Sequence, residues 1–375
     1  MSGIYVHVPF CHQACYYCNF HFSTSLQDID CLVDCLCIEL TLMRYYLRGE
    51  CVDTVYFGGG TPSILNSDQL YKITQTIKAN FDVSKNVEVT LEANPSDLTI
   101  DKLQSLLDIG VTRLSVGIQT FNEELLKTIN RRSNVDYILR CIDNIKLVGF
   151  NNFNIDIIYG IPGQIYDDIL ADINQLIKIR PTHISTYSLT IEPNTVFGVW
   201  NKRKAIKPKD DVFMSNAFLM IDSELTQHEY LHYEISNYCL PRYKSMHNSN
   251  YWDTSNKYLG IGPGAHSYNL SSRQYNISNN QLYIKSICEG SVPSVVEILT
   301  NKDKINEYIM LGLRTMSGID LNYISHEFKH NIDKTYIDSL VSANLCTINS
   351  DKLTLTPRGM LMVNDITSGM ILYTS

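Results

Sequence analysis

Long apolar runs are missing from this 375-residue sequence, and so is any excess of positive charge. A membrane-spanning helix needs roughly 18 or more consecutive apolar residues, whereas the apolar stretches here are short and interrupted. The chain has 31 Lys and Arg against 39 Asp and Glu, a formal charge of −8, which argues against nucleic acid as a partner. No basic segment followed by an apolar stretch opens the chain, so we expect no targeting peptide. We expect a cytoplasmic protein whose contact with a membrane is at most peripheral.

Cysteine is too scarce for a disulfide-stapled scaffold. The eleven cysteines are far below the roughly 8–10% of disulfide-rich secreted chains, and their number is odd. We therefore expect a reducing compartment. The hydrophobic content of 44% is sufficient for an ordinary buried core.

Short β-branched or aromatic runs alternate with helical segments from residue 4 to about residue 190. This pattern predicts repeated βα units around a parallel sheet. Apolar residues recur at helical spacing over 135–148, which predicts one of the helices. The units fall short of the eight of a complete barrel, so the sequence predicts an α/β fold, a partial (β/α)6 TIM-like barrel. The predicted strands are Ile4–Val8, Thr54–Phe57, Val87–Leu91, Arg113–Gly117, Asn154–Ile158 and His183–Ser188.

The pattern changes after residue 190. The basic stretch 202–209 predicts a solvated loop because it has no interleaved aromatics, and 211–225 predicts a helix. From about residue 304 the pattern predicts a mostly helical, winged-helix-like appendage, with Pro357-Arg358-Gly359 as a turn. The predicted domains are a barrel core (1–225), an extension (226–303) and a small C-terminal domain (304–375).

Three cysteines, Cys11, Cys15 and Cys18, follow the first predicted strand with the spacing C-x3-C-x2-C. Thiolates on one short loop select zinc or an iron–sulfur cluster. A zinc site needs a fourth ligand, which His12 or His21 could supply, whereas a four-iron cluster on three cysteines leaves one iron open. The spacing favours the open cluster, with zinc and chance clustering as alternatives.

The other eight cysteines are predicted to be ordinary core or surface thiols. Cys31 and Cys35 share one face of a helix predicted over Cys31–Leu47, and Cys37 points elsewhere. The remaining five are Cys51, Cys141, Cys239, Cys288 and Cys346.

Polar or glycine-rich segments follow several predicted strands. Each alone is typical of a tight turn or a helix cap. The carboxyl ends of parallel strands form one rim of a sheet, where such folds bind ligands, so their succession predicts a site. The segments are Gly58-Gly59-Gly60-Thr61-Pro62, Glu92-Ala93-Asn94-Pro95, Gly117-Ile118-Gln119-Thr120-Phe121 and Asp156 to Gln164.

These motifs, together with Tyr5-Val6-His7-Val8-Pro9-Phe10-Cys11, resemble radical S-adenosylmethionine (SAM) proteins of the oxygen-independent coproporphyrinogen III oxidase type, over about residues 3–320. The resemblance implies a radical SAM core domain over residues 1–225. It also implies a [4Fe-4S] cluster on Cys11, Cys15 and Cys18, whose open iron binds the amino and carboxylate groups of SAM. Reductive cleavage of SAM would then give a 5′-deoxyadenosyl radical, with an electron donor for the cluster as a partner.

The resemblance further implies a set of SAM-binding residues. Arg131 could pair a carboxylate bidentately, and Glu92 or Asp156 could accept from ammonium or ribose hydroxyl groups. The alternative for Arg131 is a place at a helix end beside the helix dipole. The implied set is Tyr5, Gly59, Gly60, Thr61, Glu92, Gln119, Arg131 and Asp156.

Departures from the oxidase pattern separate two branches of this family. The oxidase branch has a further cysteine two residues after the third cluster ligand, where this chain has Phe20, and a longer arm before Tyr5. The segment from His247 to Trp252 resembles the H-N-x-x-Y-W motif of the haem-chaperone branch, HemW. The resemblance implies His247 as a haem ligand, the alternative being a hydrogen-bonded structural histidine. His266, in a turn that follows, is left without a role.

The sequence therefore predicts a haem chaperone that binds haem, a [4Fe-4S] cluster and SAM. Its expected partners are haem and apo-haemoproteins, including respiratory proteins at the membrane, and a homodimer stays open. The alternative is an oxygen-independent coproporphyrinogen III oxidase, which decarboxylates a porphyrinogen by radical chemistry. A zinc-stabilised barrel without a redox role is a third interpretation.

Overall fold

The computed structural model describes residues 1–131 and 134–372. The predicted partial barrel is confirmed: six strands run parallel and are paired in chain order. Each predicted strand lies within an observed one. The strands are β1 (Ser2–Val8), β2 (Val52–Gly59), β3 (Val83–Ala93), β4 (Arg113–Gln119), β5 (Phe153–Tyr159) and β6 (His183–Ser188).

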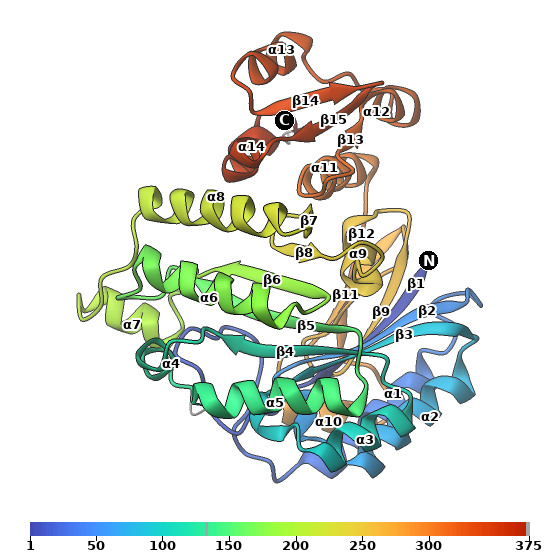
Figure 1. Cartoon of the computed structure of the whole chain (residues 1–375). Helices are drawn as coiled ribbons and strands as arrows, with labels where there is room; N and C mark the ends of the chain where they lie inside the picture. Colours follow the sequence, from blue (N-terminus) through green and yellow to red (C-terminus); the bar gives the residue numbers. More distant parts are fainter. Residues whose placement is uncertain (132–133, 373–375) are drawn as a thin grey trace.

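Helices between these strands cover the outer face of the sheet (Figure 1). The helix predicted over 135–148 is confirmed as α5. The Asn134 side chain caps its first turn, and Gly149 ends it in a left-handed conformation. Its face with Ile138, Ile142 and Ile145 is buried. The helices of this layer are α1 (Ile29–Leu42), α2 (Ser67–Asn80), α3 (Ile100–Ile109), the short α4 (Glu123–Thr128), α5 (Val135–Val148) and α6 (Tyr166–Ile179).

The helix predicted to reach Leu47 ends earlier. Helix α1 stops at Leu42, and the amides of Tyr46 and Arg48 donate to carbonyls only three residues back. Such bonds form turns in place of the i→i−4 pattern of an α-helix. The prediction was therefore wrong about this end of the helix.

The segment 226–303 extends the sheet at both of its edges. A hairpin, β7 (Leu231–Glu234) and β8 (Asn237–Cys239), pairs antiparallel with β6. Strand β9 (Lys257–Ile261) pairs parallel with β1, followed by three antiparallel strands, so that the sheet of the described residues has twelve strands. Two helices lie between β6 and β7 in the chain, α7 (Val196–Lys202) and α8 (Asp211–Gln227). The other elements of the extension are α9 (Met246–Trp252), β10 (His266–Tyr268), β11 (Ser272–Asn276), α10 (Asn280–Cys288) and β12 (Ser294–Ile298).

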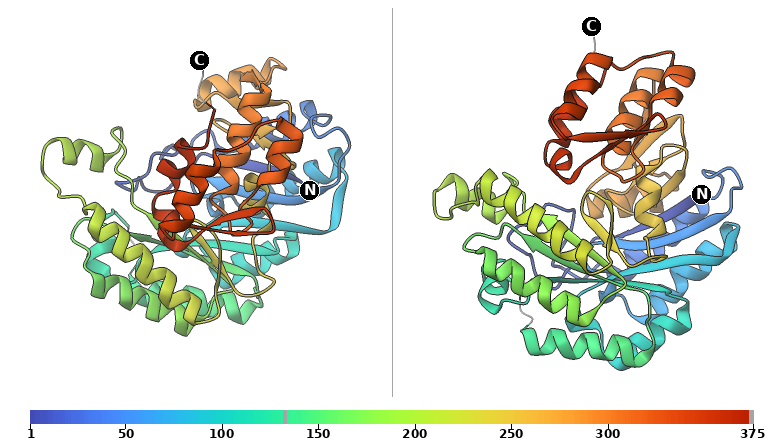
Figure 2. Two further views of the ribbon diagram at one scale, coloured as in Figure 1. Left: turned by 90° about the horizontal axis from the view of Figure 1, so that it is seen from above. Right: turned by 45° about the horizontal axis from the view of Figure 1, so that its top comes forward.

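The C-terminal part stands beyond α8 and β7 (Figures 1 and 2). Its three-stranded sheet and helices agree with the winged-helix-like prediction. The predicted turn at Pro357 was wrong: Pro357 begins a helix, because Thr356 caps the amide of Gly359 and proline is compatible with a first helical turn. The elements are α11 (Asn301–Gly312), β13 (Ile319–Asp320), α12 (Leu321–Phe328), α13 (Lys334–Ser342), β14 (Cys346–Asn349), β15 (Lys352–Leu355), α14 (Pro357–Leu361) and α15 (Val363–Ser368).

None of the helices within residues 1–131 and 134–372 combines the length and the apolar composition needed to cross a bilayer. The domain boundaries at 225/226 and 303/304 stay predictions.

Candidate functional site

The loop between β1 and α1 carries the three spaced cysteines. Backbone bonds fold it onto itself, because Cys11 N donates to Ser23 O over 3.0 Å and Ser23 N to Pro9 O over 2.8 Å. The glycine loop after β2 packs directly on it. A Cβ at Gly60 would lie 2.6 Å from the Phe10 carbonyl oxygen, so only glycine fits there. The Thr61 hydroxyl donates to the Cys11 sulfur over 3.4 Å.

The three thiols lie partly buried beside Arg131. Burial raises the pKa of Cys11, and burial raises the pKa of Cys18 to about 11; the charges of Cys15 and Arg131 act on both groups. In the described part of the chain, no three His, Cys, Asp or Glu side chains converge as they would around a metal ion. The donor set itself, three thiols on one loop, is of the type that holds an iron–sulfur cluster.

The two histidines that could complete a zinc site make other contacts. The Nε2 atom of His21 is hydrogen-bonded to Asn280 Oδ1 at 2.7 Å. The Nε2 atom of His12 lies 3.9 Å from a carboxylate oxygen of Asp97.

Glu92 lies at the end of β3, between the glycine loop and Asp156. It accepts hydrogen bonds from the Tyr56 hydroxyl over 2.8 Å and from Gly59 N over 3.2 Å. Burial, reinforced by the charge of Asp156, raises the pKa of Glu92 to about 7. Asp156 accepts from Ser115 over 3.2 Å and from another side chain of its own strand, Asn154, over 2.8 Å. Two carboxyl groups are thus held close together inside the barrel.

Gln119 and Arg131 meet above Gly117. An added Cβ at Gly117 would lie 2.9 Å from Gln119 Nε2 and 3.2 Å from Arg131 Nη2. Gln119 has a φ of +75°, at a break in the register between β4 and β5 that turns its side chain. Within the described residues, the buried Arg131 Nε atom has no hydrogen-bond partner. A buried guanidinium with an unused donor fits a carboxylate ligand.

Tyr5 completes the set from β1. Its hydroxyl is hydrogen-bonded to His7 Nδ1 at 3.1 Å, and its ring is stacked on that of Tyr56 with 6.0 Å between centroids. Burial raises the pKa of Tyr5, and the charge of Glu92 adds to the effect. The structure therefore brings the residues proposed for SAM to the carboxyl-end rim and the barrel interior beneath it.

Sequence reasoning missed Arg113 at the beginning of β4. Its side chain is only 1% exposed, and two of its guanidinium nitrogens have no partner among the described residues. Its charge acts on Glu92, Asp156 and His247. The alternation of Arg113, Ser115 and Gly117 along one strand face was the available signal, since a strand that buries polar residues every second position lines a polar interior.

His247 lies inside the barrel on α9. Its Nδ1 is 2.8 Å from the Thr54 hydroxyl and its Nε2 is 3.1 Å from the Tyr251 hydroxyl. The ring is stacked on Tyr56 at 4.8 Å, and the residue is 1% exposed. Burial lowers the pKa of His247 to about 3, so the imidazole is neutral at physiological pH. A neutral imidazole is the form that can coordinate a metal, but both ring nitrogens of His247 already have hydrogen-bond partners.

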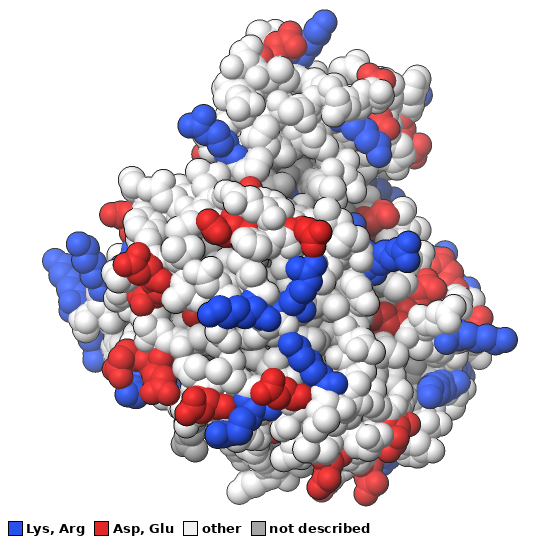
Figure 3. All heavy atoms as spheres, viewed as in Figure 1, with Lys and Arg blue, Asp and Glu red and all other residues white. Residues whose placement is uncertain are grey.

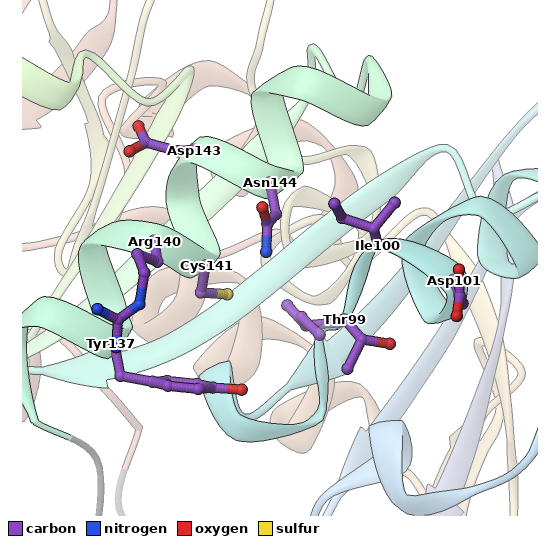
Figure 4. Close-up of a pocket in the computed structure, with 9 residues that line it drawn as sticks. Thr99, Ile100, Asp101, Tyr137, Arg140, Cys141, Asp143 and Asn144 are labelled. Carbon is purple, nitrogen blue, oxygen red and sulfur yellow. The ribbon is translucent and has the colours of Figure 1, made fainter.

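A separate cavity of about 380 Å³ lies between α3 and α5 (Figure 4). Thr99 and Asp101 line it from one side, and Tyr137, Arg140 and Asn144 from the other. None of the proposed site residues lines this cavity. On the face seen in Figure 3, acidic and basic side chains are interspersed.

Comparisons with known proteins show the families to which this chain is similar. The model of the radical SAM superfamily matches residues 5–176, and that of the HemN C-terminal domain matches residues 299–362. Heme chaperone HemW of Lactococcus lactis is 33% identical, over 97% of this chain and 96% of the relative. Heme chaperone HemW of Escherichia coli is 30% identical, over 97% and 96%. Among solved structures, the radical SAM coproporphyrinogen III oxidase HemN from Escherichia coli matches with a TM-score of 0.85 at 22% identity, covering 100% of this chain and 90% of that chain.

Proposed function

Because this chain belongs to the HemW family of radical SAM proteins, we propose that it binds haem and delivers it to apo-haemoproteins. The observation that carries the proposal is similarity to heme chaperones over nearly the whole chain. Phe20 supports it, since the oxidase pattern has a cysteine at that position.

The radical SAM family implies a [4Fe-4S] cluster and SAM. Cys11, Cys15 and Cys18 would hold the cluster. Arg131 and Gln119 would bind the SAM carboxylate, and Glu92 would accept from the SAM ammonium or ribose. When bound, the cluster and SAM supply one-electron reductive cleavage of the sulfonium.

The remaining SAM residues act through backbone shape or through their neighbours. Gly59 and Gly60 let a ligand approach the backbone closely, and Thr61 donates to Cys11. Tyr5 and Asp156 lie close enough to Glu92 to interact with its charge. The positive charge of Arg113 partly offsets the negative charges of Glu92 and Asp156. In this proposal Arg113 is therefore a positioning residue.

Haem binding through His247 requires one of its two hydrogen bonds to be replaced by a bond to iron. Coordination by Nε2 displaces the Tyr251 hydroxyl, while Thr54 can keep its bond to Nδ1. A bond at Nδ1 that fixes the ring while Nε2 binds metal is the usual arrangement for ligand histidines. The adjoining Tyr251 and Trp252 would supply apolar packing for the porphyrin.

Haem titration of the anaerobically reconstituted protein tests the proposal. We expect a Soret band that saturates near one haem per chain. His247→Ala should weaken binding about tenfold or more, corresponding to at least about 1.4 kcal/mol. The exposed His326 serves as the control, and His326→Ala should titrate like the unmodified protein.

Because His247 is buried, each variant is first compared with the unmodified protein by circular dichroism and thermal unfolding. His247→Gln, which keeps a hydrogen-bonding side chain, provides a second variant. Failure of the unmodified protein to bind haem would exclude the chaperone function. Unchanged binding by a folded His247 variant would exclude only this ligand.

Delivery is tested by transfer of haem to an apo-cytochrome of the respiratory chain in membrane vesicles. We propose such membrane proteins as recipients, a reduced protein as electron donor, and cytoplasmic residence with peripheral contact at the membrane. The alternative activity, oxidative decarboxylation of coproporphyrinogen III, would release CO2 during anaerobic turnover with a reductant and SAM, and its detection would displace the chaperone proposal.

A further inference from the structure

A second group of thiols lies where α1 packs against α10. Cys31 and Cys35 are one turn apart on α1, so they share a face of that helix. Cys288 is the last residue of α10. Helical spacing in the sequence places Cys31 and Cys35 on one face. Only the packing of α1 against α10 brings Cys288 to the same group.

Cys35 lies at the contact between the two helices. The sulfur of Cys35 donates to the carbonyl oxygen of Ile284 over 3.9 Å, and Ile284 lies one helical turn before Cys288. Cys35 also interacts through its side chain with both Cys288 and Cys31. Cys35 is buried, whereas Cys31 and Cys288 are exposed. One buried thiol therefore lies beneath an accessible thiol of another helix.

The same helix α10 is bound to the end of the cysteine loop. Asn280 Oδ1 is 2.7 Å from His21 Nε2, and Gln281 Nε2 donates to Asp28 over 2.7 Å. A covalent link between α1 and α10 would thus join two helices that flank the end of this loop. It would leave the three spaced cysteines themselves unmodified.

We propose that Cys35 and Cys288 are a redox-active dithiol that low-molecular-weight disulfides, such as oxidised glutathione, convert to an intramolecular disulfide. This site is separate from the proposed haem function and does not depend on it. A disulfide requires the two Cα atoms to lie within about 7 Å of each other, so the link can form only where α1 and α10 approach that closely at these two residues.

The order of attack follows from exposure. The Cys288 thiolate attacks one sulfur of the glutathione disulfide and releases one glutathione thiolate. Cys35 then attacks the Cys288 sulfur and releases the second glutathione. Two protein thiols are oxidised, one disulfide is reduced, and the two protons pass to the two glutathiones. Burial raises the pKa of Cys35 to about 12, so this thiol is protonated at neutral pH and gives up its proton, which the departing glutathione thiolate takes up, only as it attacks the mixed disulfide.

The experiment incubates the anaerobically reconstituted holoprotein with oxidised glutathione without oxygen, and follows the visible absorption of the cluster. After alkylation of free thiols, the protein is digested and its linked peptides are mapped by mass spectrometry. We expect one peptide pair joined through Cys35 and Cys288, with the visible absorption retained. Dithiothreitol should reverse the link.

Three variants make the result specific. Cys288→Ser and Cys35→Ala should each fail to form the link, and Cys288→Ser should also lose the intermediate mixed disulfide. Cys51 is an exposed thiol elsewhere, so Cys51→Ser should form the link as the unmodified protein does. A stable glutathione adduct without an internal link, a Cys31–Cys288 link, or no reaction at Cys288 would each overturn the proposal.

Discussion

Individual buried carboxyl groups are a recurrent feature of this protein. Burial raises the pKa of Glu39, Glu92, Asp172 and Glu234 to about 7 in each case. Within the described part of the chain, three of the four, Glu39, Asp172 and Glu234, accept hydrogen bonds only from residues outside the proposed site. Glu39 accepts from Gly262 N, Asn276 Nδ2 and the Tyr283 hydroxyl over 2.7, 2.6 and 2.5 Å, and so joins α1, the turn after β9, β11 and α10.

Glu39 should make stability depend on pH. Its pKa in the folded protein, about 7, is above the ordinary value of 4.5. The folded state therefore binds the proton more tightly than the unfolded state, and this contribution to the free energy of unfolding decreases as pH rises from about 4.5 to 7. Glu39→Gln removes that contribution, so the variant's free energy of unfolding should decrease less between pH 5 and pH 8.

Urea unfolding at several pH values measures this effect. Glu289→Gln, at an exposed residue, should retain the pH dependence of the unmodified protein. Equal pH dependence in Glu39→Gln and the unmodified protein would contradict the assignment. At pH 8, Glu39→Gln should also be less stable by about 1–3 kcal/mol, because an amide cannot accept from all three donors.

At the scale of elements, the end of β2 shows how the cysteine loop and the glycine loop form one unit. Gly59 has a φ of +109°, and an added Cβ would lie 2.6 Å from the His7 ring. Its amide donates to Glu92. The conformation thus serves two purposes, since it lets β1 and β2 approach closely and aims a backbone donor at the proposed SAM site.

Gly59→Ala should therefore lower the free energy of unfolding more than a comparable glycine substitution elsewhere. Gly149 is the matched control, with a φ of +97° and no atom near its added Cβ. Gly149→Ala should lose only the conformational energy, about 1–2 kcal/mol. Gly59→Ala should lose a further ~1–3 kcal/mol through overpacking and should bind SAM more weakly in calorimetry. Equal thermal unfolding of the two variants would contradict the packing argument.

At the scale of the whole molecule, backbone hydrogen bonds and an ion pair of described residues link the C-terminal domain to the barrel. Ile235 N donates to Arg314 O and Met316 N donates to Tyr233 O, over 2.9 and 3.0 Å. Arg273 of β11 forms an ion pair of 2.7 Å with Glu307 of α11, whose side chain is only 9% exposed. This pair connects the extended sheet to the first helix of the appendage.

Removing the arginine should leave a largely buried carboxylate without its partner. We expect Arg273→Met to lower the free energy of unfolding by about 1–3 kcal/mol. The exposed pair Arg180 and Glu229 is the control, and Arg180→Met should cost about 0–1 kcal/mol. A double-mutant cycle with Glu307→Gln measures the coupling. Similar losses from Arg273→Met and Arg180→Met would show that the buried pair does not link the two parts.

Local patterns in the sequence determined the strands, the helix over 135–148 and the winged-helix-like appendage, because alternation, helical spacing and caps act over a few residues. They were wrong about the end of α1, which turn hydrogen bonds place at Leu42, and about Pro357, which begins a helix capped by Thr356. The cysteine spacing likewise favoured an iron–sulfur cluster at the loop after β1, with zinc as an alternative.

The tertiary structure alone decided what meets across the chain. It brings Arg113 beneath Glu92 and Asp156, engages both nitrogens of His247, and places Cys288 beside Cys35. No local pattern encodes these contacts, because sheet pairing and helix packing join segments far apart in the sequence. Burial there also sets the protonation of the side chains, since the cost of desolvating a charge depends on everything packed around it.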